Sequence, residues 1–325
     1  MALSLSCAFA TSLDSHEHAR IAESLGYSRA WFYDSPALYP DVWVQLCRAA
    51  DRTQRIGLGT GVLVPHLRHP MTTAAAVATL VSAAGAARVT VGVGSGFTGC
   101  VSMGRRPLKW SYVADYLRAL RGLLRGEEIE WEGGVARMLH WPGYGAQRPI
   151  EVPFVIAAAG PKGIAVAQEL GQGVFGAFEP IQGFDWSVVL IMGTVLDAGE
   201  AVGSPRALAA AGHGGAVMFH YALEHGTLAH IPEGEAWQRA YAQVPQRTRH
   251  LEMHDGHLVG VNARDRPYIS GELLASHGLI RDRAAWRDRL QTLAAGGATE
   301  IAYQPAGPDI PRELEAFAAA AQGLT

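Results

Sequence analysis

The 325-residue sequence contains little cysteine and little charge, and each shortage excludes a class of protein. Its three cysteines, Cys7, Cys47 and Cys100, are odd in number and far apart, so they match neither a disulfide framework nor a zinc knuckle. Charged residues make up 18% of the chain, and its lysines and arginines form no basic stripe of the kind that binds nucleic acid. We therefore expect a protein of the reducing cytoplasm that has no nucleic-acid partner.

Long hydrophobic runs are also missing from the sequence. No apolar run reaches the roughly 18 residues that a membrane span requires, and Ser82 and Gly85 interrupt the apolar segment 74–87. Residues 1–11 lack a basic start and a cleavage site, so we interpret them as a buried strand rather than a signal peptide. Hydrophobic residues still make up 49% of the chain, which predicts a large core. Because no apolar run is long enough to span a membrane, we expect no membrane partner.

The chain instead alternates short apolar runs, typical of buried strands, with segments of helical periodicity. The first part predicts strands over residues 3–10, 29–33, 56–64 and 88–93, and helices over 18–25, 41–52 and 70–83. A fourth helix is indicated where apolar residues between 113 and 124 recur at helical spacing. Residues 127–145 then break the rhythm with Gly-Gly, Trp and Pro, which predicts an inserted hairpin.

The alternation resumes after this insertion. It predicts strands over residues 152–159, 173–177, 207–219 and 299–304, and helices over 162–170 and 186–202. Strands that alternate with helices form a parallel sheet covered by helices, and eight such units favour a closed (β/α)₈ TIM-type barrel over an open sheet. We expect one domain over residues 1–325, with residues 221–278 forming loops and helices over the barrel mouth.

Three of the predicted strands end in glycine-rich segments, at residues 57–62, 92–99 and 157–163. Functional groups of a (β/α)₈ barrel lie at the carboxyl ends of its strands, and glycine there lets a ligand approach the backbone closely. Because the three segments would share one rim of the barrel, we expect them to form one binding site.

Residues 94–99 match the G-x-G-x-x-G pattern of dinucleotide-binding folds. That pattern requires a helix to open directly on the loop after a first strand, whereas Pro107 delays the helix here and the strand is the fourth. The match therefore gives little support to a nicotinamide cofactor.

Gly160-Pro161-Lys162-Gly163 opens a predicted helix and is suited to bind an anion. The free N–H groups of a first helical turn, the helix dipole and the Lys162 ammonium all favour a phosphate. The alternative is an ordinary strand-to-helix turn with proline at the first helical position.

Four motifs, taken in their order and spacing, resemble the luciferase-like monooxygenases, in particular the branch near deazaflavin-dependent methylenetetrahydromethanopterin reductases. The resemblance covers almost the whole chain. It rests on Trp31-Phe32-Tyr33-Asp34, on Gly59-Thr60-Gly61-Val62 with Arg68-His69-Pro70, on residues 91–96, and on Ala158-Ala159-Gly160-Pro161-Lys162.

The resemblance implies a barrel that is usually a homodimer and holds a flavin-type ring over its strand ends. It also implies a non-prolyl cis peptide after the third strand, at Gly61–Val62, and a coenzyme phosphate near residues 95–98 and 160–163. The cofactor-binding residues that it predicts are Asp34, Thr60, Gly61, Val62, Gly94, Ser95, Gly96, Phe97, Thr98, Ala158, Ala159, Gly160, Pro161, Lys162 and Gly163.

The chain departs from its apparent relatives at two candidate catalytic positions. Ser35 stands where several relatives carry histidine, and Phe97 stands where some carry an acid, so the acid/base pair of the sugar-dehydrogenase relatives is missing. Asp34 and Ser35 remain as catalytic candidates, with helix capping as the alternative for Asp34. Candidate residues of a substrate pocket are Tyr39, Trp43 and His257, with plain packing as the alternative.

Histidines cluster twice in the sequence, at His66 and His69 and again around His254 and His257. Their spacing fits no common metal-ligand frame, so we expect no metal.

The resemblance favours an oxidoreductase that transfers a hydride between an 8-hydroxy-5-deazaflavin coenzyme and a small-molecule substrate. The first alternative is an FMN-dependent monooxygenase that acts with O₂, and the second is a non-catalytic barrel. Nothing in the sequence identifies the substrate.

Overall fold

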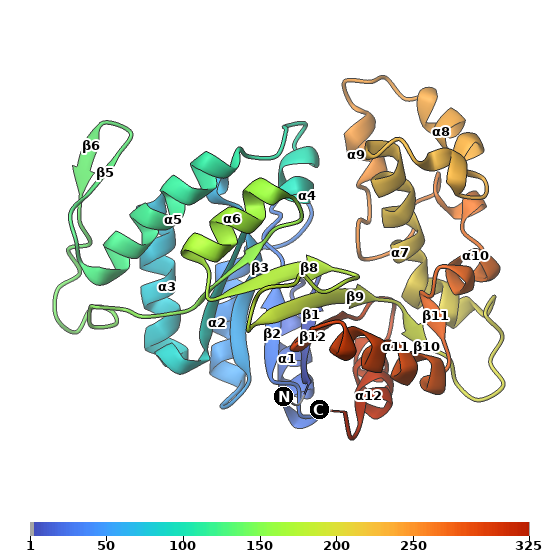
Figure 1. The fold of residues 1–325 in the computed structure, drawn as a ribbon, viewed down its shortest axis with the longest axis horizontal. Helices are drawn as coiled ribbons and strands as arrows, with labels where there is room; N and C mark the ends of the chain where they lie inside the picture. The colour runs from blue at the N-terminus through green and yellow to red at the C-terminus, as the bar shows by residue number, and fades with distance from the viewer. Residues whose placement is uncertain (1–2, 325) are drawn as a thin grey trace.

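In a computed structural model, which describes residues 3–324, eight parallel strands close into a barrel (Figure 1). The strand order around the barrel is β1-β12-β9-β8-β7-β4-β3-β2, and β1 pairs with both β2 and β12. The predicted (β/α)₈ fold is therefore confirmed. The barrel strands are β1 (Ser4–Phe9), β2 (Arg29–Phe32), β3 (Gly57–Leu63), β4 (Val89–Gly94), β7 (Phe154–Ala157), β8 (Gly173–Ala177), β9 (Ser187–Met192) and β12 (Glu300–Gln304).

Helices pack around the outside of the barrel, and the first five of them lie close to their expected positions, whereas the last two, α11 and α12, were not predicted. The Asp41 carboxylate caps one of them by accepting the N–H groups of Trp43 and Val44, and the apolar face of another, α5, is buried. No helix among residues 3–324 combines the length and apolarity needed to cross a membrane. The barrel helices are α1 (Ser15–Ser24), α2 (Val42–Arg52), α3 (Pro70–Ala84), α5 (Trp110–Arg125), α6 (Pro161–Leu170), α11 (Arg283–Ala295) and α12 (Ile310–Ala321).

The predicted insertion is an antiparallel hairpin of β5 (Ile129–Trp131) and β6 (Gly134–Ala136), which projects from one side of the barrel (Figure 1). The rings of Tyr112 and Tyr116 on α5 contact the ring of Trp131 edge-on, with centroids 5.7 and 5.8 Å away. Short helical turns follow three strands or helices: η1 (Pro65–Leu67), η2 (Ala86–Arg88) and α4 (Phe97–Val101).

The helix predicted over residues 186–202 is wrong. This segment forms β9 and the short strand β10 (Thr194–Val195), which pairs with β11 (Ile280–Arg281). The run Ser-Val-Val-Leu-Ile-Met at 187–192 is almost entirely buried, as expected of a central parallel strand, and such a run shows no helical period. The connection from β8 to β9, residues 178–186, consequently carries no helix.

The strand predicted over residues 207–219 is also wrong, because this segment lies within the helix α7 (Pro205–Glu224). The Ser204 hydroxyl caps α7 by accepting the Ala207 N–H, and proline occupies the first turn. Its internal glycines serve close packing, since a Cβ on Gly212 would lie 2.6 Å from Cγ2 of Val261. Glycine inside an alanine-rich segment therefore indicated contact with a neighbouring segment, and did not break the helix.

Residues 205–278, which we call the helical cover, gather on the side of the barrel away from the hairpin (Figure 1). The cover has its own hydrophobic cluster around Phe219 and Trp237, whose rings stack with centroids 5.3 Å apart. The predicted loops and helices of residues 221–278 are confirmed. Besides α7, the cover contains η3 (Leu228–His230), α8 (Gly234–Ala242), α9 (Arg249–Met253), η4 (Arg266–Tyr268) and α10 (Gly271–Ser276).

The amino end of the barrel is filled by a buried polar group around Glu300. Its carboxylate accepts hydrogen bonds from the indole N–H groups of Trp31 and Trp186, each at 2.9 Å. The guanidinium of Arg29 lies 3.9 Å from the same carboxylate and stacks over both indoles, 5.3 and 4.9 Å from their ring centroids. Both indole N–H groups are thus satisfied, Nη1 of Arg29 donates to Thr90 at 3.1 Å, and the indoles fill the space between the strands.

We expect Glu300→Ala to destabilise the protein by about 3–5 kcal/mol, because it leaves a largely buried guanidinium without its counter-charge and removes the carboxylate acceptor of two indole N–H groups. Urea unfolding followed by circular dichroism measures the loss. The control is Glu169→Ala, which removes an exposed carboxylate paired with Arg118 and should change the unfolding free energy by less than about 1 kcal/mol. Equal losses in the two variants would contradict the importance of the Glu300 group.

Candidate active site

A cavity of about 650 Å³ opens at the carboxyl ends of the barrel strands. Its volume lies within the range of small-molecule and cofactor sites. The barrel contributes residues in or just after β2, β3, β4, β7, β8 and β9, and the helical cover contributes a second wall. The cover residues in this wall are Tyr221, Glu224, His225 and Leu258.

Glycine residues on β3 and β4 are required by the contact between these two strands. A Cβ on Gly92 would overlap the carbonyl oxygen of Thr60, and one on Gly94 would lie 2.8 Å from Cγ2 of Val62. The pairing of β3 with β4 shifts register between Thr60 and Leu63, and the Gly61–Val62 peptide is cis, as the resemblance implied. The contact between the strands therefore accounts for Gly92 and Gly94 without a ligand.

Gly160 differs from these glycines because it faces open space. A Cβ on Gly160 would meet no atom within 4 Å, and the residue lines the cavity immediately before α6. Pro161 occupies the first turn of α6, and the next residue, Lys162, is exposed. Helix end and ammonium together make this edge of the cavity attractive to an anion.

The Asp34 carboxylate is buried at the end of β2 and is held by Arg68. Both of its oxygens lie 2.9 Å from Nη1 of Arg68, while Nη2 of Arg68 donates to Asp41 at 2.6 Å. Burial raises the pKa of Asp34, and the Arg68 guanidinium offsets that rise only in part. Asp41, and not Asp34, caps the helix that follows, α2, so helix capping does not explain Asp34.

Hydrogen bonds between the barrel and the cover fix the position of Leu258 in the cavity wall. Tyr33 donates to the side-chain oxygen of Gln304 at 3.3 Å, and the amide nitrogen of Gln304 donates to the Leu258 carbonyl at 2.9 Å. Tyr39 donates to the carbonyl of His257 at 2.7 Å. Side chains at the strand ends thus hold the cover against the mouth of the barrel.

The structure brings most of the predicted site residues together. The predicted residues that line the single cavity at the strand ends are Asp34, Ser35, Tyr39, Gly61, Val62, Gly94, Ser95, Gly96, Phe97, Thr98, Ala158, Ala159 and Gly160.

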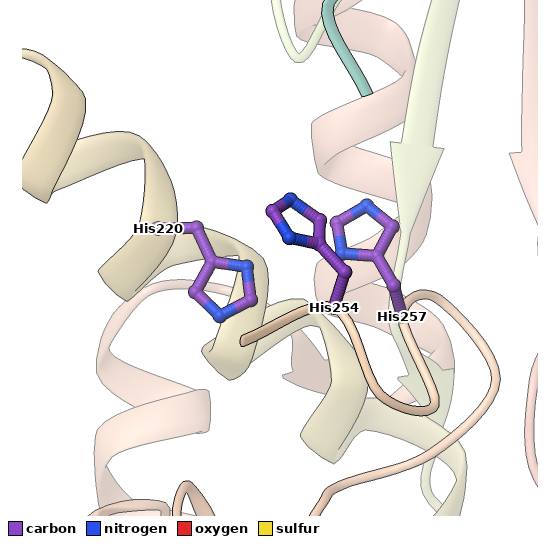
Figure 2. Close-up of side chains that lie close together, drawn as sticks. All are labelled: His220, His254 and His257. Carbon is purple, nitrogen blue, oxygen red and sulfur yellow. The ribbon is translucent and has the colours of Figure 1, made fainter. Parts of the chain in front are cut away.

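The other predicted residues lie near the cavity but outside its lining. Thr60 is buried in β3 and donates to the Gly92 carbonyl, and Trp43 packs in the core from α2. Pro161, Lys162 and Gly163 form the first turn of α6. The imidazole of His257 lies against His220 and His254 within the cover (Figure 2).

Sequence reasoning missed the cavity residues at the end of α7, namely Tyr221, Glu224 and the capping residue His225. Their spacing places them on one side of a helix, but the segment before them was assigned to a strand. The capping serine and the proline at 204 and 205 were the available signals for this helix. Gly99 and Ala157 also line the cavity and lie inside the glycine-rich segments that were expected to form the site. Other missed lining residues are Tyr33, Val64, Trp110, Phe175, Gly176, Ala177, Leu190 and Leu258.

The sequence profile of the luciferase-like monooxygenase family matches residues 14–300. The chain therefore belongs to this family.

One curated relative is the 5,10-methylenetetrahydromethanopterin reductase of Methanolobus tindarius, which is 31% identical over 166 residues. The match covers 48% of this chain and 48% of that relative, so the chain spans about half the length of the curated protein.

Two solved structures share the fold. The coenzyme F420 dependent tetrahydromethanopterin reductase from Methanopyrus kandleri has a TM-score of 0.67 at 18% identity, with 98% of both chains covered. The oxygenating constituent of 3,6-diketocamphane monooxygenase from Pseudomonas putida, in complex with FMN, has a TM-score of 0.61 at 12% identity, with 100% of this chain and 98% of that chain covered.

We expect Arg68→Ala to destabilise the protein by about 3–5 kcal/mol, because it leaves the buried Asp34 carboxylate without its cation. The unpaired carboxyl would take up a proton in the folded state at a pH where it is ionised in the unfolded chain. The loss should therefore be larger at about pH 8 than at about pH 5. Urea unfolding at both pH values measures it.

Asp34→Asn in the Arg68→Ala background serves as the control. An amide at position 34 carries no charge, so the double variant should recover stability at the higher pH and lose the extra pH dependence. A pH-independent loss in Arg68→Ala that Asp34→Asn leaves unchanged would contradict the ion-pair account.

Proposed function

We propose that the protein is an oxidoreductase that binds an 8-hydroxy-5-deazaflavin coenzyme in the cavity at the strand ends and transfers a hydride between it and a small organic substrate. The observation that carries the proposal is the open edge of the cavity at Gly160, next to the first turn of α6 and Lys162. The reductases among the relatives, one of them dependent on coenzyme F420, support the choice of a deazaflavin.

The residues of the cavity fit such a coenzyme. Val62, Phe175 and Leu190 supply apolar walls for a planar ring, and the edge at Gly160 leaves room for a polar chain to leave the cavity. The N–H groups of the first turn of α6 and the Lys162 ammonium would hold a phosphate there. Ring and phosphate sites thus lie along one continuous surface.

When bound, the deazaflavin supplies a two-electron hydride carrier. The chain's own contribution is then to orient the substrate over the strand ends and to exclude water. Arg68 holds the Asp34 carboxylate in a fixed position, so Asp34 and Ser35 are suited to hydrogen-bond a substrate or ring edge. Polar residues on the opposite wall, Glu224 and His225, line the same cavity at the carboxyl end of α7.

The second candidate is an FMN-dependent monooxygenase acting with O₂. It is favoured by the FMN complex of a structural neighbour with the same fold. The two functions differ in their coenzyme, because a deazaflavin lacks the ring nitrogen that supports oxygen activation in flavins. A direct comparison of coenzyme binding therefore separates them, and a barrel that binds neither would be non-catalytic.

The test is titration of the purified protein with F420 and with FMN, followed by ring absorbance and fluorescence. Gly160→Phe should weaken binding by at least about tenfold because its side chain extends into the cavity edge, which the fold leaves open. Gly203→Phe is the matched control, since Gly203 is exposed, has no atom within 4 Å of its Cβ position and lies outside the cavity lining.

Lys162→Ala tests the anion site separately from the ring site. It should weaken coenzyme binding by about tenfold at low salt, whereas Arg55→Ala, which removes another exposed cation, should leave it unchanged. Tighter binding of FMN than of F420 would transfer the protein to the monooxygenase class. Binding of neither coenzyme would refute the proposed function.

A further inference from the structure

Three histidine side chains converge inside the helical cover, apart from the cavity lining. His220 lies on α7, and His254 and His257 follow α9 (Figure 2). One ring nitrogen from each lies within 4.8 Å of those of the other two. The side chain of His220 is 9% exposed, and His254 and His257 are 6% and 9% exposed. The fold thus joins two residues close in sequence with a third from a separate helix.

The hydrogen bonds of the cluster leave nitrogen lone pairs unused. Nδ1 of His254 lies 2.8 Å from the carbonyl oxygen of His250, so it carries the proton and Nε2 presents a lone pair. Both ring nitrogens of His220 and Nδ1 of His257 are buried and have no hydrogen-bond partner among residues 3–324. Buried polar nitrogens without partners cost free energy, so a ligand that occupies them would stabilise the cover.

Burial of the three imidazoles also favours their neutral form. Burial, together with the proximity of His254, lowers the pKa of His220 to about 3. Burial likewise lowers the pKa of His254 and of His257. Burial thus favours the neutral imidazole in each ring, and neutral imidazole is the form that ligates a metal.

A buried carboxylate lies beside the cluster. The nearer oxygen of Asp265 is 3.8 Å from Nε2 of His220. Its other contacts hold it in place, since it accepts hydrogen bonds from Trp237 at 2.7 Å, Tyr241 at 2.9 Å and Asn262 at 2.8 Å. A carboxylate next to a ligating histidine orients the ring and contributes negative charge near the ion.

We propose that His220, His254 and His257 bind one Zn²⁺ ion, which fastens α7 to the segment after α9. Three imidazole nitrogens suit zinc and leave one position of a tetrahedral site for water. Zn–N bonds of about 2.0–2.1 Å place tetrahedral nitrogens roughly 3.3–3.4 Å apart, so the rings need to approach one another by side-chain rotation. The site is distinct from the proposed coenzyme site, because none of the three histidines lines the cavity.

The position of the ion would matter for the cavity next to it. His220 precedes Tyr221, and His257 precedes Leu258, and both of these neighbours belong to the cavity wall. A bond between the two segments through the ion would hold this wall together. Zinc is therefore assigned a structural role in the cover, and this role does not depend on which coenzyme the cavity binds.

The test begins with the full chain, stripped of metal by dialysis against a chelator and titrated with Zn²⁺ in competition with a chromophoric chelator. Elemental analysis gives the stoichiometry, and titration with Co²⁺ reports the coordination geometry through its visible d–d bands. We expect one ion per chain, a tetrahedral Co²⁺ spectrum and a higher unfolding temperature with Zn²⁺ than without it. Mg²⁺, which prefers oxygen ligands, should produce none of these effects.

His254→Ala should weaken Zn²⁺ binding by more than the roughly 10- to 100-fold that loss of an outer partner costs, and should abolish the Co²⁺ bands. His230→Ala, which removes an exposed imidazole from the same cover, is the matched control and should bind as the unaltered chain does. If His254→Ala fails to fold, His220→Asn, first shown by circular dichroism to fold in the metal-free state, is titrated in its place and should lose Zn²⁺ binding in the same way.

Substoichiometric Zn²⁺ binding in the unaltered chain would overturn the proposal. So would an equal loss of binding in His254→Ala and His230→Ala, or an octahedral Co²⁺ spectrum. Because every readout is metal binding or thermal unfolding, failure here is distinguishable from failure of the proposed coenzyme binding.

Discussion

The buried group around Glu300 determines which end of the barrel can hold a ligand. One carboxylate accepts hydrogen bonds from two buried indole N–H groups and forms an ion pair with the Arg29 guanidinium. The strands that carry these side chains begin there, so their bulk fills the amino end. At the carboxyl ends, small residues such as Gly94 and Ala158 stand in place of the indoles, so that the space for the cavity stays open. The position of the cavity thus follows from packing at the opposite end of the barrel.

At the carboxyl ends, one contact between strands sets the shape of the cavity floor. Thr60 directs its carbonyl at Gly92, and the next residues place the Val62 side chain against Gly94. Any side chain on either glycine would push β3 from β4. The motif that suggested a ligand pressed against glycine is therefore explained first by strand packing, while Gly160 is free to meet a ligand. Glycine loops in a sequence indicate close approach without telling whether strand or ligand approaches.

The barrel could be predicted from the sequence where each short apolar run is followed by a helical segment, as in residues 3–124. It could not be predicted where tertiary contacts override local signals. The run 187–192 has no period that distinguishes a buried strand from a buried helix. The glycines of α7 argue against a helix in the sequence alone, and only the structure shows that Gly212 makes room for Val261. In the candidate site, the loops at the strand ends could be predicted from their position after each strand. The part of the wall formed by α7 could not, because the helix itself was not predicted.

The wrong strand assignment of residues 207–219 also hid the histidine cluster, because His220 lies on α7. The same helix connects the cluster to the cavity. Successive residues of a helix are about 100° apart around its axis, so α7 presents Tyr221 to the cavity while His220 faces the interior of the cover. The loop after α9 divides its residues in the same way, with Leu258 at the cavity and His257 in the cluster. The end of α7 and the loop after α9 therefore form one wall, which has the cavity on one side and the histidine cluster on the other. Any ion or contact that fixes the second side limits how far the first can open.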